Sequence, residues 1–199
     1  MRKIRADRGD EDRQATKSDK LLGKGRALSD RAEHERVFRQ LAADLEPELL
    51  RIGRGLLGDW DEALDASQQT LLTLWQHLPA LDTSAPLRPW VLRVHVNRCR
   101  SLLRRRRVRR WLRLEDLPEV PAPPPANEHD LPEVEDLLRL ARGLSRRQRE
   151  AWLLCDLEEL DSAVAGAALG CRPETVRVHL MRARARLRAG WLKEQEERP

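Results

Sequence analysis

Apolar side chains recur every three or four positions between residues 37 and 56, which is the spacing of a helix with one buried face. They are Val37, Phe38, Leu41, Leu45, Leu49, Ile52 and Leu56. We expect this helix to begin near Ser29 or Asp30 and to close at Gly58. Pro47 lies inside it and is expected to kink the helix or to begin a new one.

A second helix is predicted after Asp59, which with Glu62 forms the pattern of a capping box. Its inner seam is expected to hold Leu64, Ser67, Leu71, Leu74 and Leu78. Another face is polar but carries few charges, with Asp65, Gln68, Gln69, Leu72 and Gln76. Such a face fits either a protein-binding surface or a solvated helix side.

A third helix is predicted from Trp90 to Arg113, after a proline-rich loop from Pro79 to Pro89 that contains Asp82-Thr83-Ser84. Its packing positions are Leu92, Val96, Cys99 and Leu103, and beside them runs a polar stripe of Arg93, Asn97, Arg100 and Arg104. Seven arginines follow Leu103 with no intervening acid: Arg104, Arg105, Arg106, Arg107, Arg109, Arg110 and Arg113. This density of charge indicates a polyanion such as nucleic acid, and a solvated helix end is the alternative.

The charge changes sign after Arg113. Residues 114–132 hold acids and prolines with no Lys or Arg, which predicts an extended acidic linker. It acts as a spacer or lies in a basic channel as nucleic acid would.

The last part, residues 133–192, carries the pattern of a helix-turn-helix domain. A capping box at Ser145 and Gln148 opens one helix, and an alanine-rich helix from Ser162 to Leu169 ends at Gly170. Pro173 opens a longer basic helix whose inward positions are Val176, Leu180, Ala183 and Leu187. Its other positions at the turn and first turns, Arg172, Glu174, Thr175, Arg177, Val178, His179 and Arg182, are expected to face a DNA groove.

Composition fits an all-α protein of two small helical domains joined by a flexible linker, because Tyr is absent, Phe occurs once, and Leu, Ala, Arg and Glu are abundant. Residues 1–30 mix both charges with few large apolar side chains and are expected to be a disordered tail, and residues 193–199 are expected to be a tail after the second domain. The three cysteines are odd in number and far apart, which indicates a reducing compartment. We find no signal peptide pattern and no membrane-spanning run, so we expect a cytoplasmic protein.

No catalytic arrangement is evident. His95 and Cys99 are four residues apart on a helix, but two ligands are too few for a metal, and both are expected to be core or boundary residues. Glu158, Glu159 and Asp161 are interpreted as a solvated helix end. The sequence predicts a protein that is not an enzyme, with no metal site and no cofactor.

Taken in order, residues 33–190 resemble a bacterial RNA polymerase sigma factor of the extracytoplasmic function (ECF) group of the sigma-70 family, with region 2, a linker and region 4. Ala63-Leu64-Asp65-Ala66-Ser67-Gln68-Gln69 corresponds to the family's Ala-Glu-Asp-Leu-x-Gln-Glu, and Trp90 and Asn97 also match. In the second domain, Leu169-Gly170, Thr175-Val176-Arg177 and Arg182-Ala183-Arg184 follow the family pattern. The sequence departs at Leu64, Gln69, Leu71 and Ser101, and has Val164-Ala165-Gly166 for the usual Glu-Ile-Ala.

The resemblance implies a transcription initiation factor with three binding faces. Core RNA polymerase, through its beta-prime clamp, would bind Asp65, Gln68, Gln69 and Leu72, while the beta flap would meet region 4. The minus-ten promoter element would be held by Asp82, Thr83, Arg93, Asn97, Arg100 and Arg104. The minus-thirty-five element would be read by the seven residues given above for the basic helix. An anti-sigma partner is also implied. A stand-alone helix-turn-helix regulator that binds an operator is the alternative.

Overall fold

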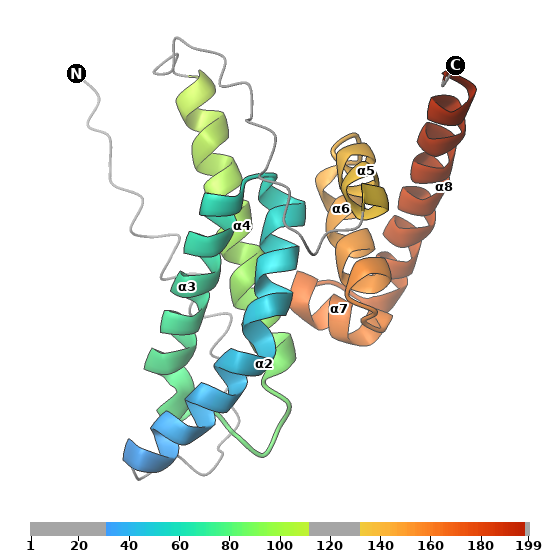
Figure 1. The fold of residues 1–199 in the computed structure, drawn as a ribbon. Helices are drawn as coiled ribbons and strands as arrows, with labels where there is room; N and C mark the ends of the chain where they lie inside the picture. The colour runs from blue at the N-terminus through green and yellow to red at the C-terminus, as the bar shows by residue number, and fades with distance from the viewer. Residues whose placement is uncertain (1–30, 112–131, 198–199) are drawn as a thin grey trace, which may run out of the picture.

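A computed structural model describes residues 31–111 and 132–197. The tail expected at residues 1–30 and most of the linker expected at 114–132 lie outside these residues. The first half forms a bundle of three long helices, α2 (Arg31–Leu57), α3 (Trp60–His77) and α4 (Arg88–Trp111), with a short 3-10 turn, η2 (Leu78–Ala80), after α3. The second half comprises α5 (Pro132–Ala141), α6 (Arg146–Trp152), η3 (Leu153–Leu157), α7 (Ser162–Leu169) and α8 (Pro173–Glu197) (Figure 1). The prediction of an all-α protein with two helical domains is confirmed.

Local signals explain most helix boundaries. The Asp59 side chain accepts a hydrogen bond of 2.9 Å from the Glu62 amide, so the predicted cap of α3 is present. Gly58, with φ of 69°, ends α2 in the left-handed region that glycine adopts without strain. α2 runs unbroken through Pro47, which lies on its exposed side. Pro47 therefore neither ends that helix nor begins a second one.

The buried seam of α3 differs from the predicted one. Ala63, Ala66, Ser67, Thr70 and Leu74 are the buried side chains, whereas Leu64 and Leu71 are only partly buried. Small residues occupy the seam because α2 approaches closely there: a Cβ added to Gly53 would lie 3.2 Å from that of Ala63. Ser67 and Leu74 were predicted correctly, and Leu78 in η2 is buried as well. Leu64 and Leu71 were wrong by one position, because binary hydrophobicity favours leucine over the smaller Ala63 and Thr70.

α4 is fastened to the rest of its bundle at both ends. Near its start, Arg88 binds the buried Glu48 carboxylate of α2, with Nη2 to Oε1 at 2.9 Å and Nε to Oε2 at 3.0 Å. Near its end, Arg106 donates from Nε to Glu62 at 2.6 Å and from Nη1 to the Leu57 carbonyl at 3.0 Å. These two arginines fix the rotation of α4 about its axis, and with it the direction in which every other side chain of the helix points.

The second half contains the predicted helix-turn-helix. Asp161 caps α7 by accepting from the amides of Ala163 at 2.7 Å and Val164 at 2.9 Å. Gly170 ends α7 with φ of 70°. At Gly166 a Cβ would come within 2.8 Å of the Cys171 carbonyl oxygen, so the tight approach of α7 to the turn requires glycine. Pro173 opens α8 as expected, and α8 continues to Glu197, past the boundary expected at residue 192.

Between α6 and α7 the chain makes one turn of π-helix, η3. It is followed by Glu159, a residue other than glycine that has a positive φ, 51°. The turn brings Glu158 back toward α2, where its carboxylate is buried. The expectation that Glu158 belongs to a solvated helix end was therefore wrong, because the carboxylate has a cationic partner in the first bundle.

The two halves pack against each other, and their buried apolar residues form one continuous cluster from Leu45 to Leu187. The main contact is between α4 and α7, with α2 lying beside η3 (Figure 1). A Cβ on Gly55 would meet Leu153 Cδ2 at 2.5 Å, which shows how closely α2 and η3 approach. The described residues thus form a closed arrangement of the two domains.

His95 and Cys99 lie in the core of the first bundle, as the sequence predicted. Both are fully buried, with His95 Nδ1 3.1 Å from Thr70 Oγ1 and Nε2 3.7 Å from Cys99 Sγ. Burial lowers the pKa of His95 to about 4, because an imidazolium would be poorly solvated there. Burial also raises the pKa of Cys99 to about 12, so its thiol is a packing group rather than a nucleophile.

The buried imidazole gives the fold a defined response to acid. In the unfolded chain His95 takes up a proton near pH 6.5, but in the folded chain only near pH 4. We therefore expect the free energy of unfolding to lose up to about 3 kcal/mol from this group as the pH falls from 6.5 to 4, with no contribution to the slope above pH 7. Denaturant unfolding of the wild type and of His95→Gln at pH 7.5 and pH 5 checks this. Equal loss of stability in both proteins would contradict the assignment.

Candidate nucleic-acid and polymerase interface

The outer face of α3 is exposed along three turns. Asp65, Gln68 and Leu72 are exposed and Gln69 is partly so, with Leu72 retaining 47% of its accessible surface. Trp75 follows on the same side of the helix, seven residues after Gln68. A polar face with an exposed leucine at its centre is suited to binding another protein.

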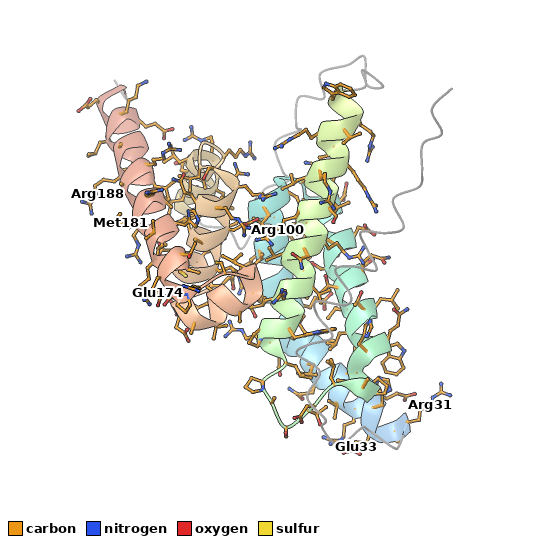
Figure 2. All side chains as sticks on the ribbon, turned by 180° about the vertical axis from the view of Figure 1, so that it is seen from behind. Arg31, Glu33, Arg100, Glu174, Met181 and Arg188 are labelled. Atoms are coloured by element: carbon orange, nitrogen blue, oxygen red, sulfur yellow. The ribbon has the colours of Figure 1, made fainter. Side chains whose placement is uncertain are left out.

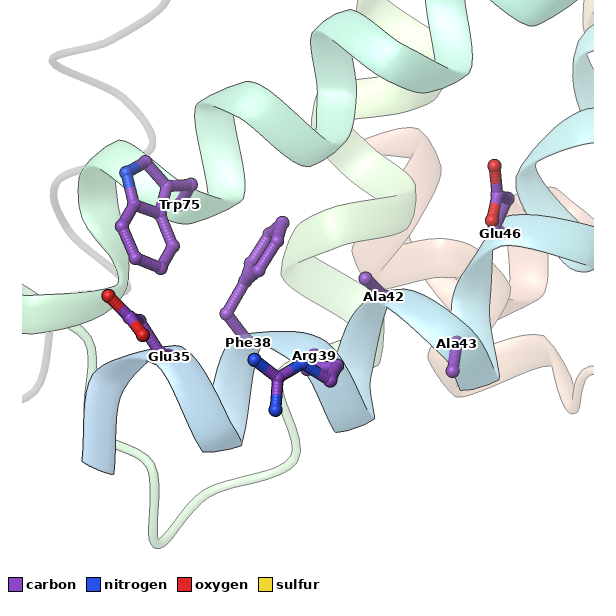
Figure 3. Close-up of a pocket in the computed structure, with 7 residues that line it drawn as sticks. All are labelled: Glu35, Phe38, Arg39, Ala42, Ala43, Glu46 and Trp75. Carbon is purple, nitrogen blue, oxygen red and sulfur yellow. The ribbon is translucent and has the colours of Figure 1, made fainter. Parts of the chain in front are cut away.

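A surface hollow continues this face where α2 passes α3. Figure 3 shows Phe38 and Trp75 side by side in it, with Glu35, Arg39 and Glu46 of α2 around them. Trp75 stacks on His34 with ring centroids 4.0 Å apart and meets the edge of Phe38 at 5.1 Å. The hollow is therefore a partly apolar surface. Trp90 of α4, by contrast, is buried.

The first part of the predicted α4 stripe faces the second domain. Arg93, Asn97 and Arg100 are all partly buried. A Cβ on Gly170 of the α7 terminus would lie 3.6 Å from Nη2 of Arg93, and Arg100 Nη2 lies 3.4 Å from the Leu169 carbonyl. Figure 2 shows Arg100 on the side of α4 toward the second domain.

Arg100 forms the most buried ion pair between the two domains. Its Nε and Nη2 donate to Oε1 and Oε2 of Glu150 in α6, at 2.7 and 2.8 Å, and the Glu150 side chain is 1% exposed. Nη1 of Arg100 donates to Asn97 Oδ1 at 3.1 Å, so two members of the stripe are fixed together. Arg146 and Arg147 also lie 3.7 Å from the same carboxylate. The guanidinium holds a carboxylate in the bidentate geometry with which it would hold a phosphate.

A second ion pair closes the opposite side of the domain contact. Arg51 of α2 donates to Glu158 Oε1 from Nε at 2.9 Å and to Oε2 from Nη2 at 2.6 Å. The Glu158 side chain is 2% exposed, and the hydrogen bonds to this carboxylate raise the pKa of Arg51. Two carboxylates of the second domain are thus neutralised by two arginines of the first.

The loop before α4 is shaped by one of its predicted site residues. Asp82 Oδ1 accepts from the Ser84 amide at 3.0 Å and from the Ser84 hydroxyl at 2.6 Å. These hydrogen bonds lower the pKa of Asp82. Thr83, between the two, is exposed. Asp82 therefore holds the loop in a turn, and Thr83 is the side chain that the loop presents.

Beyond Arg100 the stripe leaves the domain contact. Arg104 is exposed and donates to Ser101 Oγ at 3.3 Å. Arg105, Arg107 and Arg109 are also exposed. α4 contains no acidic residue over its whole length, so its last turns form the most concentrated positive charge among the described residues of the first bundle.

The first turns of α8 present the second basic face. Arg172, Glu174, Thr175, Arg177, Val178 and Arg182 are exposed, and His179 is partly buried. Arg177 binds Glu174 Oε1 at 3.0 Å and Ser162 Oγ at 3.0 Å, so its guanidinium is held between the beginnings of α7 and α8. Arg184, by contrast, is occupied by Asp156 at 2.6 Å and 3.0 Å. Figure 2 shows Glu174, Met181 and Arg188 along the side of α8 away from the first domain.

Sequence reasoning missed four residues of these surfaces. Glu150, Glu158 and Arg51 form the interdomain pairs, and no pattern distinguishes a carboxylate that will be buried from one that faces solvent. Met181, 63% exposed, extends the α8 face between Val178 and Arg182. Its helical position, three residues after Val178, was the available signal.

No histidine, cysteine or carboxylate groups among the described residues gather into a set of three that would hold a metal ion. Within the same residues, no helix combines the length and apolar character needed to cross a bilayer.

Comparison with known proteins identifies both halves. Residues 41–109 match the family model for Sigma-70 region 2, and residues 135–187 match that for Sigma-70 region 4. The chain is 31% identical over 166 residues to the RNA polymerase sigma factor CnrH of Cupriavidus metallidurans, covering 78% of this chain and 87% of CnrH. It is 32% identical over 142 residues to the ECF RNA polymerase sigma factor SigE of Mycolicibacterium smegmatis, covering 69% of this chain and 55% of SigE.

The fold agrees with these matches. The sigma factor RpoE of Bartonella quintana, solved in complex with the anti-sigma factor NepR, superposes with a TM-score of 0.66 and 28% identity, over 77% of this chain and 96% of RpoE. These relatives are sigma factors, and sigma factors are transcription initiation factors rather than enzymes. The chain belongs to the ECF group of the sigma-70 family of RNA polymerase sigma factors.

Proposed function

We propose that this sigma factor binds its partners through three faces: α3 binds core RNA polymerase, α4 with its preceding loop binds the minus-ten element, and α8 binds the minus-thirty-five element. The proposal depends on the different character of three faces. α4 and α8 each carry a basic face, one on each domain, and α3 carries a polar face with few charges. A protein partner and two DNA segments require surfaces of these different characters.

The α8 face suits duplex DNA. Side chains at the beginning of the second helix of a helix-turn-helix reach base edges in the major groove. Arg172 and Arg177 supply donors for guanine, Glu174 accepts from cytosine, and Val178 contacts thymine methyl groups. His179, being partly buried, supports the helix more than it reads bases. Arg182 follows one turn later, where side chains meet phosphates.

The α4 face suits a melted strand. Arg93, Arg100 and Arg104 are spaced along one side of the helix to meet successive phosphates, while the Asn97 amide and the Thr83 hydroxyl offer hydrogen bonds to an unpaired base. Because Arg88 and Arg106 fix the rotation of α4, this stripe is rigid before DNA arrives. A rigid stripe loses little conformational entropy on binding.

The arrangement of the two domains is, in this proposal, a closed state that has to open for initiation. Arg100 cannot hold a phosphate while its Nε and Nη2 bind Glu150 and its Nη1 binds Asn97. Opening exchanges the Glu150 and Glu158 carboxylates for DNA phosphates and polymerase contacts. An anti-sigma partner that binds this factor would act by favouring the closed state, and RpoE, one of its relatives, was solved with such a factor.

A stand-alone regulator is less well supported. Such a protein needs a first domain that senses a signal or dimerises, but here the first domain matches Sigma-70 region 2. Its α3 face and basic α4 stripe have a use only where polymerase and melted DNA are both present.

Charge reversal on α3 tests the polymerase face. Asp65→Arg places a cation on an exposed position of the outer face of α3, so the fold should remain stable. We expect its affinity for core polymerase to fall at least tenfold, measured by competition against the wild-type protein, and promoter-dependent initiation to fall with it. Glu196→Arg, an equal charge change on exposed α8, is the control and should bind as the wild type does. Unchanged assembly of Asp65→Arg would contradict the docking assignment.

Removal of one interdomain carboxylate tests the closed state. Glu150→Gln leaves Arg100 without a counter-charge, and breaking a buried pair in this way costs about 3–5 kcal/mol. We expect the free protein to expand in small-angle scattering and to bind promoter DNA more tightly without polymerase.

A second variant opens the same contact without changing charge. In Gly55→Phe the aromatic ring would collide with Leu153 across the domain contact. Both variants should retain helical circular dichroism. If both remain as compact as the wild type, the domains do not open at this contact.

A further inference from the structure

The last two turns of α4 carry an exposed face that shares only its first residue, Arg104, with the three assigned surfaces. It begins at Arg104 and continues through Arg107 and Val108 to Trp111. Val108 is 50% exposed and Trp111 is 80% exposed. An indole so open to water is unusual in a folded chain, because burial of its large apolar surface is favourable.

Helical geometry places these four residues together. At 3.6 residues per turn, positions separated by three, four and seven lie on one side of a helix. Arg106 points the other way, where it binds Glu62 and the Leu57 carbonyl. Because this arginine fixes the helix end to α3, the opposite side, with Arg104, Arg107, Val108 and Trp111, is directed away from the first bundle. We name it the distal face.

The distal face is the continuation of the promoter stripe. Arg93, Asn97 and Arg100 lie on the same side of α4, further toward its beginning. These three are covered by α7 and α6, whereas the distal face is exposed in the same closed arrangement. One continuous surface is thus half covered and half open.

We propose that the distal face binds single-stranded DNA, with Arg104 and Arg107 on the phosphates and a base stacked on Trp111. This inference rests on the proposed function and extends its minus-ten surface by two helical turns.

Charge and shape together select this partner. α4 has no acidic residue, so the face attracts a polyanion. A duplex keeps its bases stacked inside and offers Trp111 no ring to cover, while an unpaired strand offers one at every nucleotide. Basic side chains with an aromatic platform are the usual means of holding single strands without reading their sequence.

The location gives the face a use in initiation. Since it is open before the domains separate, it can hold a strand while Arg100 still binds Glu150. The same strand can then follow the stripe inward as Glu150 leaves.

Trp111 lies outside the residues that match Sigma-70 region 2, which end at 109.

The experiment uses the full-length protein alone, because the distal face needs no polymerase to be open. Fluorescence anisotropy with a labelled oligo(dT) of about 16 nucleotides measures single-strand binding, and a mixed-sequence duplex of equal length measures duplex binding. We expect Trp111→Ala to weaken oligo(dT) binding about 5- to 100-fold, the range given by the loss of one stacked base, and to leave duplex binding unchanged. Trp111→Phe should retain most of the affinity.

The arginines have a separate signature. Arg107→Ala should lower the slope of log affinity against log salt by about 0.7, the value for one phosphate of a single strand. Arg36→Ala on α2 and Leu192→Ala on α8 remove an exposed charge and an exposed apolar side chain elsewhere, and both should behave as the wild type.

Three outcomes would overturn the inference. The first is an affinity of Trp111→Ala for oligo(dT) equal to that of the wild type. The second is an equal loss of affinity for duplex and single-stranded DNA in this variant. The third is a loss of affinity for oligo(rU) alone, which would make the partner RNA. Initiation by the wild type with core polymerase is measured separately. Failure there would refute the proposed function, whereas normal initiation with unaltered variants would refute only the distal face.

Discussion

The bidentate pair between Arg100 and Glu150 is the interaction on which the arrangement of the whole molecule depends. It joins the centre of α4 to the centre of α6, and it is the most buried charge pair across the domain contact. Burial makes such a pair all-or-none, because separating the partners inside the protein costs more than keeping them together or solvating both. In the proposed opening, the two domains are therefore expected to separate fully rather than to move apart by a small distance.

The pair also explains why an arginine of the promoter stripe lies in a domain contact. A guanidinium binds carboxylate and phosphate through the same planar fork of donors. A protein that must bind DNA in one state and stay folded in another can use one arginine for both, provided that a carboxylate replaces the phosphate. In the proposed function, Glu150 would fill that role for Arg100, so the interface that covers the stripe would use the same chemistry by which the stripe binds phosphates.

Much of the fold could be predicted from local signals. Asp59, Gly170 and Pro173 act at helix ends through their own backbone geometry and hydrogen bonds, which depend on a few neighbouring residues. Asp161 acts in the same way as the cap of α7, although it was interpreted as part of a solvated helix end. The seam of α3 and the burial of Glu150 could not be predicted, because both depend on what lies across the contact. Ala63 is buried since Gly53 lets α2 approach, and Glu150 is buried since Arg100 neutralises it. The candidate faces were predictable as patterns, but their coverage in the closed state was not.

Closure has different consequences for the two ends of α4. In the proposed function, binding of a strand at its centre competes with the Glu150 carboxylate, so the apparent affinity there is multiplied by the fraction of molecules that are open. Arg107 and Trp111 of the distal face are exposed in the closed state, so a strand there would not compete with Glu150. A strand that binds first at the distal end would raise its own concentration beside the covered stripe. The proposal thus couples opening of the two domains to the presence of melted DNA.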